Sequence, residues 1–223
     1  MNNIKKIKWI FFDIGGVLVD DSEYENRRID SIYKTVKNYR PDITKKDILE
    51  VRPKASGMLG GLTANIVSLF LKEEDKRQTV LRDIDKNWRN RDISAVRPEA
   101  KNILEKLSEK YNLGLMANQP VKVRERLERS DLLKYFRIKK VSEDFNLSKP
   151  DPAFFKLILQ KCNTNPEQVA IIDDNIERGL IPAKKLGMTT VWFKLEERDV
   201  PDSVGYAVSN LDGLLDIFLS VNQ

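Results

Sequence analysis

The residues best suited to chemistry in this sequence lie where apolar runs end. Asp13 follows the run WIFF, and Asn118 ends the run LGLMAN. Asp173 and Asp174 end a third run, and Lys149 lies in the turn SKPDP. If these runs are parallel strands, the groups meet beyond the strand ends, where open sheets bind ligands. Carboxylates that meet there repel one another unless a cation lies between them, so the pattern favours a site of acids, a lysine and a metal.

Two glycines follow the first of these acids, so the turn carries no side chains at Gly15 and Gly16. Glycine allows a ligand or a neighbouring group to approach the main chain closely. An aspartate at the end of a buried strand, followed by a turn of two glycines, predicts that a metal ion or a negatively charged group comes very near the backbone here.

Histidine is absent from the 223 residues, and its absence removes several classes of enzyme. Ser-His-Asp hydrolysis, Cys-His proteolysis and histidine-based zinc sites all need the imidazole. The single cysteine, Cys162, has Gln168 six residues later, where a cysteine-dependent phosphatase needs an arginine. Acid–base chemistry is left to carboxylates, lysine or tyrosine, and a catalytic metal is left to oxygen ligands, which favours Mg2+.

The chain is basic, with a net charge of +5 and a pI near 9.1. Its cationic residues are dispersed and are not interleaved with aromatic residues, so we expect a small anionic partner such as a phosphate ester and no nucleic acid. No apolar run reaches the roughly 18 residues that span a bilayer, and the N-terminus lacks a secretory cleavage site. Because a single cysteine also fits a reducing compartment, we expect a cytoplasmic protein that does not bind membranes.

Continuous apolar runs predict strands that are covered on both faces, as in a parallel sheet. The candidate strands are Ile7–Asp13, Leu113–Asn118, Arg137–Val141, Val169–Asp173 and Thr189–Phe193. Amphipathic segments lie between them, and one of these begins with Asp151 as N-cap and Pro152 at the first helical position. Alternation of strands and helices favours an α/β fold with a doubly wound parallel sheet.

One long segment breaks this alternation and carries only helical pattern. It spans residues 22–92, and roughly 70 residues is too long for a simple crossover. We therefore expect an inserted helical subdomain at 22–92, which would act as a cap over the site. The α/β core would comprise residues 1–21 and 93–223.

Four segments of the chain, in this order, resemble the haloacid dehalogenase-like hydrolase superfamily. They are FFDIGGVLVD, LGLMANQP, SKPDPAFF and AIIDDNIERGLIPAKKLGMTTVWF. The helical insert occurs where many members of the superfamily carry their cap. Most members that resemble this pattern are Mg2+-dependent phosphatases, and the prototypes are dehalogenases. The resemblance implies a Rossmann-like core, a helical cap and Mg2+ as cofactor.

The resemblance also implies a role for each residue at the strand ends. Asp13 would be the nucleophile and would form an aspartyl phosphate. Asp13, Asp174 and the backbone carbonyl of Gly15 would bind Mg2+, and Lys149 would neutralise charge on the phosphoryl oxygens. The substrate phosphate would also be held by residues of two loops, namely Gly16, Val17, Ala117 and Asn118.

Three positions depart from the usual pattern of the superfamily. Gly15 stands where phosphatases carry an aspartate as general acid and base, a group worth about 10²–10⁴ in rate. Ala117 stands where a serine or threonine is usual, and Gly179 where an aspartate or asparagine is usual. Asp173 is a candidate to replace the last of these through the water shell of the metal.

The departures leave three functions open. The first is a Mg2+-dependent phosphatase of a small phosphorylated metabolite. Dehalogenation of a haloacid agrees with Gly15, because halide leaves without a proton, but the Asp173-Asp174 pair and Ala117 disfavour it. The third is a binding or scaffolding protein that has lost turnover. The sequence names neither the substrate nor the oligomeric state.

Overall fold

The computed structural model describes residues 4–88, 95–194, 199–202 and 204–220. The chain divides into two compact units, one formed by Met1–Asp20 with Ala95–Gln223 and the other by Asp21–Ser94. The first unit carries a parallel sheet flanked by helices, which confirms the α/β class. In the described part of the second unit, every regular element is a helix.

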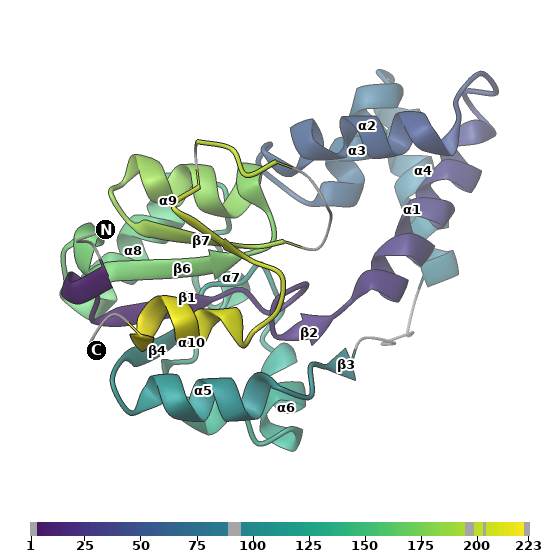
Figure 1. The fold of residues 1–223 in the computed structure, drawn as a ribbon. Coiled ribbons are helices and arrows are strands. Elements are labelled where there is room, and N and C mark those ends of the chain that lie inside the picture. The colour runs from purple at the N-terminus through teal and green to yellow at the C-terminus, as the bar shows by residue number, and fades with distance from the viewer. Residues whose placement is uncertain (1–3, 89–94, 195–198, 203, 221–223) are drawn as a thin grey trace. The chain divides into compact units, whose positions relative to one another are not determined.

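The sheet of the first unit has six strands in the order β5-β4-β1-β6-β7-β8, all paired in parallel (Figure 1). The strands are β1 (Trp9–Phe12), β4 (Asn112–Leu115), β5 (Phe136–Ile138), β6 (Val169–Asp173), β7 (Thr189–Phe193) and β8 (Tyr206–Val208). The chain runs outward from β1 through β4 to β5 and then returns to the other side of β1. The point where the strand order reverses therefore lies beside β1, and sheets of this kind bind ligands at that point.

Helices cover both faces of the sheet, as Figure 1 shows. The helices α5 (Ala100–Ser108), α6 (Val123–Arg129) and α10 (Gly213–Phe218) pack on one face, and α8 (Pro152–Cys162) and α9 (Ile181–Lys185) pack on the other. Along β1, Ile10 and Phe12 face the first layer and Phe11 faces the second. Both faces of the central strand are buried, which explains the continuous apolar run in the sequence.

The predicted strand bounds are correct for β6 and β7, but the other three are too long. Met116, Ala117 and Asn118 lie beyond the end of β4, and β5 ends at Ile138, three residues before the predicted end. The sequence also missed β8 and a short antiparallel ribbon of β2 (Val19–Asp20) and β3 (Ala95–Val96). The predicted N-cap residue of α8 is confirmed, because the Asp151 carboxylate accepts the Ala153 N–H.

The described part of the second unit, residues 21–88, contains four helices with a core of their own. They are α1 (Ser22–Lys37), α2 (Lys45–Ser56), α3 (Leu62–Phe70) and α4 (Glu74–Trp88). Each helix contributes at least one fully buried aliphatic residue, namely Ile32, Ile48, Ile66 and Val80. The expected end of the insert at residue 92 lies outside the described residues. No helix in the described ranges combines the length and the apolar character that crossing a bilayer requires.

Candidate active site

Strand register brings the predicted site residues to the edge of the sheet at which the strands have their carboxyl-terminal ends. Phe12 of β1 is level with Leu115 of β4 and with Ile172 of β6. The next residue of β1, Asp13, donates its backbone N–H to the Ile172 carbonyl oxygen at 2.9 Å. Asp13 therefore lies at the edge of the sheet where the loop after β4 begins and where β6 ends with Asp173.

Lys149 lies between two carboxylates at this edge. Its Nζ is 3.1 Å from Asp13 Oδ2 and 2.6 Å from Asp173 Oδ2, and its side chain is 0 % exposed. Burial by itself lowers the pKa of Lys149, but the charges of Asp13 and Asp173 outweigh burial, so the pKa lies above its ordinary value. Lys149 is thus a permanent cation that touches the proposed nucleophile.

Asp13, Asp173 and Asp174 can each offer an oxygen to a common point, since these atoms lie within 4.8 Å of one another. Asp13 and Asp173 each have both oxygens engaged. Oδ1 of Asp13 accepts the Ile14 N–H at 2.8 Å and Oδ1 of Asp173 accepts the Asn175 N–H at 2.8 Å, while both Oδ2 atoms contact Lys149. Carboxylates are oxygen donors of the kind that Mg2+ prefers, so the cluster of three acids fits a Mg2+ ion.

The turn after Asp13 comes very close to Asp174. Gly16 has φ +74°, and a Cβ atom built there would lie 2.6 Å from Asp174 Oδ2. An L-residue with a side chain is thus excluded both by backbone conformation and by space. This contact supplies a physical reason for the second glycine of the sequence and places the main chain of the turn against the acidic group.

Val17 follows Gly16 in the turn and is fully buried. Within the described ranges, its backbone N–H has no hydrogen-bond acceptor, whereas the next two N–H groups, of Leu18 and Val19, both donate to the Ile14 carbonyl oxygen. Buried N–H groups are almost always paired, so an orphan of this kind is suited to an anion supplied by a ligand.

Asn118 positions Lys149 through a pair of hydrogen bonds. Asn118 Nδ2 donates to the Lys149 carbonyl oxygen at 2.7 Å, and the Lys149 N–H donates to Asn118 Oδ1 at 2.8 Å. The side chain of Asn118 therefore fixes the backbone from which the buried lysine projects. Ala117 precedes it and is fully buried, and its methyl group offers no hydrogen bond to a ligand.

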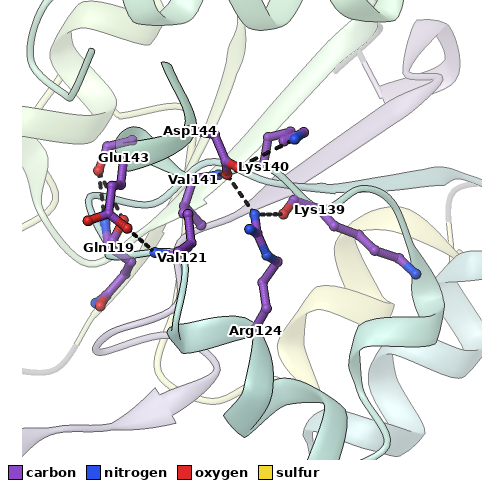
Figure 2. A network of polar contacts seen from close by, with 9 residues as sticks. Gln119, Val121, Arg124, Lys139, Lys140, Val141, Glu143 and Asp144 are labelled. Atoms are coloured by element: carbon purple, nitrogen blue, oxygen red, sulfur yellow. Dashed lines mark hydrogen bonds and ion pairs between the residues drawn. The ribbon is translucent and has the colours of Figure 1, made fainter. Parts of the chain in front are cut away.

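The loop after Asn118 is fastened to α7 (Ser142–Phe145), as Figure 2 shows. The Val121 N–H donates to Glu143 Oε2 at 2.6 Å, and the Gln119 N–H donates to Ser142 Oγ at 3.1 Å. Ser142 Oγ in turn donates to the Gln119 carbonyl oxygen at 3.2 Å. These bonds hold the loop that carries Ala117 and Asn118 in one conformation.

An ion pair strengthens the same region. Asp144 accepts the Val141 N–H at 2.8 Å and an Arg124 N–H at 2.7 Å (Figure 2). Arg124 also donates to the Lys139 carbonyl oxygen. Burial by itself raises the pKa of Asp144, but the Val141 hydrogen bond and the Arg124 charge outweigh it, so the pKa lies below its ordinary value.

Gly179, five residues after Asp174, lies against Asp173. A Cβ atom at position 179 would come within 2.2 Å of Asp173 Oδ2. The carboxylate of Asp173 thus fills the space into which a side chain at position 179 would extend. The sequence linked the two residues only through the metal, with Asp173 as a candidate to replace the side chain that is missing at position 179, and their direct contact was not predicted.

Sequence reasoning missed two residues that touch this site. Trp192 in β7 donates its indole N–H to the Asp174 carbonyl oxygen at 3.1 Å. Arg97 donates to the carbonyl oxygens of Gly16 and Val17. The partners are backbone atoms in both cases.

Comparison with known proteins agrees with this geometry. The sequence matches the haloacid dehalogenase-like hydrolase family over residues 10–193. The chain belongs to this family. Because the family consists of hydrolases, the chain is an enzyme. Its acidic cluster lies at the ends of the strands, beside the point where the strand order reverses.

The hydrolase is also similar to individual proteins over nearly its whole length. It is 27% identical to a glyceraldehyde 3-phosphate phosphatase of Pyrococcus furiosus, over 96% of this chain and 94% of the relative. It is 27% identical to a phosphorylated carbohydrates phosphatase of Thermotoga maritima, over 82% and 83%. Its fold resembles that of a haloacid dehalogenase-like hydrolase of Streptococcus pneumoniae, with a TM-score of 0.68 and 18% identity over 96% and 99% of the two chains.

Proposed function

We propose that this hydrolase is a Mg2+-dependent phosphatase of a small phosphorylated metabolite and acts through an aspartyl phosphate on Asp13. The observation that carries the proposal is the contact of a permanently charged, fully buried Lys149 with Asp13 at 3.1 Å, beside Asp174. Phosphoryl transfer depends mainly on positioning and on stabilisation of charge, and this arrangement supplies both.

In the proposed reaction an Asp13 oxygen attacks phosphorus, the bond from phosphorus to the ester oxygen breaks, and the leaving oxygen departs with the electron pair. Lys149 balances charge on the nucleophile and the phosphoryl oxygens, and the Val17 N–H donates to one of those oxygens. Mg2+ bound by Asp13, Asp174 and the Gly15 carbonyl would supply further positive charge at the phosphoryl group. Water then hydrolyses the aspartyl phosphate and restores the Asp13 carboxylate.

Gly15 gives the proposed enzyme a preference among leaving groups. With glycine at this position, the turn offers no carboxyl group there to protonate the leaving oxygen. Alkyl phosphates need that proton, so they should be slower than aryl or acyl phosphates by up to about 10²–10⁴. A steep dependence of kcat/KM on the pKa of the leaving alcohol supports this role of Gly15, and a flat dependence contradicts it.

The substrate class is inferred from the relatives. They are named for glyceraldehyde 3-phosphate and for phosphorylated carbohydrates, so we infer a small phosphorylated carbohydrate or a related metabolite as substrate. The helical unit would act as the cap that excludes water and selects the substrate. We also infer a cytoplasmic location, because the single cysteine fits a reducing compartment.

The experiment that tests the mechanism traps the intermediate. The enzyme is mixed with p-nitrophenyl phosphate and Mg2+, quenched with borohydride and digested, and the peptide containing residue 13 is weighed. Borohydride reduces an aspartyl phosphate to homoserine, so the expected product has homoserine at position 13. Asp13→Asn is the matched control and should show neither the reduced peptide nor phosphate release.

Four results would overturn the proposal in different ways. Turnover by Asp13→Asn, or turnover after chelation of Mg2+, rules out the mechanism. Chloride release from 2-chloropropionate without metal supports a dehalogenase. Phosphate binding by calorimetry without turnover of any phosphate ester supports a binding protein.

A further inference from the structure

Arg97 makes an unusual set of contacts with the turn that follows Asp13. Its Nε donates to the Val17 carbonyl oxygen at 3.0 Å and its Nη2 to the Gly16 carbonyl oxygen at 3.1 Å. Its backbone N–H donates to the Leu18 carbonyl oxygen at 2.9 Å. One residue therefore holds three consecutive carbonyl groups of a turn that lies about 80 residues away in sequence.

The guanidinium group of Arg97 is itself held in place. It lies over the ring of Phe193 at 5.0 Å from the ring centroid, and Nη1 is 3.8 Å from Asp20 Oδ2. The side chain is only 17 % exposed. A planar guanidinium stacked on an aromatic ring has few orientations available, so its donors act as fixed points for the turn.

The contact with Gly16 fixes the direction of an N–H group that the proposed reaction uses. The carbonyl of Gly16 and the N–H of Val17 belong to one planar peptide unit and point in opposite directions. Because Arg97 holds the Gly16 oxygen, the Val17 N–H must point away from Arg97. This N–H is the buried donor that has no acceptor within the described ranges.

We propose that Arg97 is a positioning residue, which holds the Val17 N–H in the orientation that binds a phosphoryl oxygen. This inference rests on the proposed function. Arg97 would act through the backbone and would not touch the substrate. Loss of its side chain frees the peptide between Gly16 and Val17 to rotate, so phosphate binding and the chemical step should both weaken.

The test compares Arg97→Met and Arg97→Lys with a matched control. Arg77 in the helical unit also donates to two consecutive carbonyl oxygens, those of Leu71 and Lys72, and also pairs with a nearby acid, Glu74. Arg77→Met removes the same kind of clamp from a different place. For each variant, kcat and KM with p-nitrophenyl phosphate, the inhibition constant of inorganic phosphate and the thermal unfolding midpoint are measured.

Arg97→Met should lower kcat/KM about 10²-fold, the effect of misplacing one group by about 1 Å. It should also raise the inhibition constant of phosphate about tenfold or more, because one hydrogen bond to a charged group is lost. Arg97→Lys keeps the charge but cannot donate in one plane to two carbonyl groups, so it should fall between wild type and Arg97→Met. Arg77→Met should remain within about twofold of wild type on both measures.

Free guanidinium provides a second readout that a purely structural residue would not move. Added guanidinium should restore part of the activity of Arg97→Ala and should leave Asp13→Asn inactive. A folded Arg97→Met with wild-type kcat/KM and phosphate inhibition overturns the proposal. If that variant fails to fold, Arg97→Lys carries the same test.

Failure of the proposed function would look different from failure of the role of Arg97. If the wild-type protein binds phosphate but turns over no ester, the enzyme mechanism is wrong, and phosphate affinity measured by calorimetry still decides on Arg97. Weaker phosphate binding by Arg97→Met than by Arg77→Met then supports the positioning role, and equal binding contradicts it.

Discussion

The ion pairs at the ends of the sheet strands and those in the helical unit, residues 21–94, are formed by the same residue types but differ in exposure to solvent. Lys149, between Asp13 and Asp173, is completely buried. In the helical unit, the Lys45 and Asp30 side chains pair at 2.6 Å but are 45 % and 46 % exposed. The distances are similar, so the difference lies in solvent. Water screens the second pair, and only the first can hold charge against a reacting group.

Burial, rather than the number of charges, distinguishes the pair that we propose to act on the substrate from the pairs of the helical unit. A buried ion lowers the stability of the folded protein unless it is paired, and a buried pair by itself adds little net stability. Stability alone therefore does not explain the burial of Lys149, whereas its proposed role at the phosphoryl group would explain it. Four variants test this comparison.

Lys149→Met should have the largest effect. It leaves Asp13 and Asp173 buried without their common cation, so the free energy of unfolding should fall by about 3–5 kcal/mol. The rate kcat should fall about 10²–10³-fold, because one stabilising charge at the phosphoryl group is lost. Urea unfolding in the presence of a chelator measures the first effect, and p-nitrophenyl phosphate hydrolysis the second. An unchanged unfolding midpoint would show that the pair at the sheet edge behaves like a surface pair.

Asp144→Asn should have a smaller effect that depends on pH. Asp144 is 8 % exposed and accepts from Val141 and Arg124, so loss of its charge should lower the free energy of unfolding by about 1.5–3 kcal/mol at pH 7. The pKa of Asp144 in the folded protein lies below its unfolded value of about 3.9. The stabilisation is therefore complete above about pH 4 and is lost as pH falls through the folded pKa.

Urea titrations from pH 7 to pH 2 measure this dependence. Wild type should lose stability over the acid range, and Asp144→Asn should lose less over the same range. Parallel curves for the two proteins would contradict the assignment. The result would also sharpen the comparison, since Asp144 is intermediate in exposure between Lys149 and Lys45.

Gly179→Ala should show how closely the edge is packed. Its Cβ atom would lie 2.2 Å from Asp173 Oδ2, so the variant should lose about 1–3 kcal/mol through overpacking. In an Asp173→Ala background the same change should cost much less, because the obstructing carboxylate is gone. A double-mutant cycle measures this coupling, and additive losses would show that position 179 does not press on Asp173.

The strand bounds could be predicted from the sequence where a continuous apolar run matches a fully buried strand. Each of the five residues of β6 and of β7 is buried, so their bounds were predicted correctly. The ribbon of β2 and β3 has two residues in each strand, too few to show a period. β8 is only half-buried and its three residues were overlooked for the same reason.

The site was predictable as a set of residue types but not as a set of contacts. Asp13 and Lys149 could be named because they follow buried runs and turns. The contact of Asp173 Oδ2 with Lys149 joins residues 24 positions apart, and no spacing in the chain reveals it. The contacts of Arg97 end on backbone carbonyl oxygens, which every residue has, so the sequence carries no trace of them.

Lys45→Met should have the smallest effect of the four. The pair with Asp30 is about half exposed and joins α2 to α1, so its loss should lower the free energy of unfolding by less than about 1 kcal/mol. The loss should shrink further in 0.5 M salt, where exposed charges are screened. Lys149→Met should lose almost as much stability in 0.5 M salt as without it, because water and ions do not reach the buried pair. Urea unfolding of both variants at the two salt concentrations decides the matter, and equal salt dependence would break the distinction between the two regions.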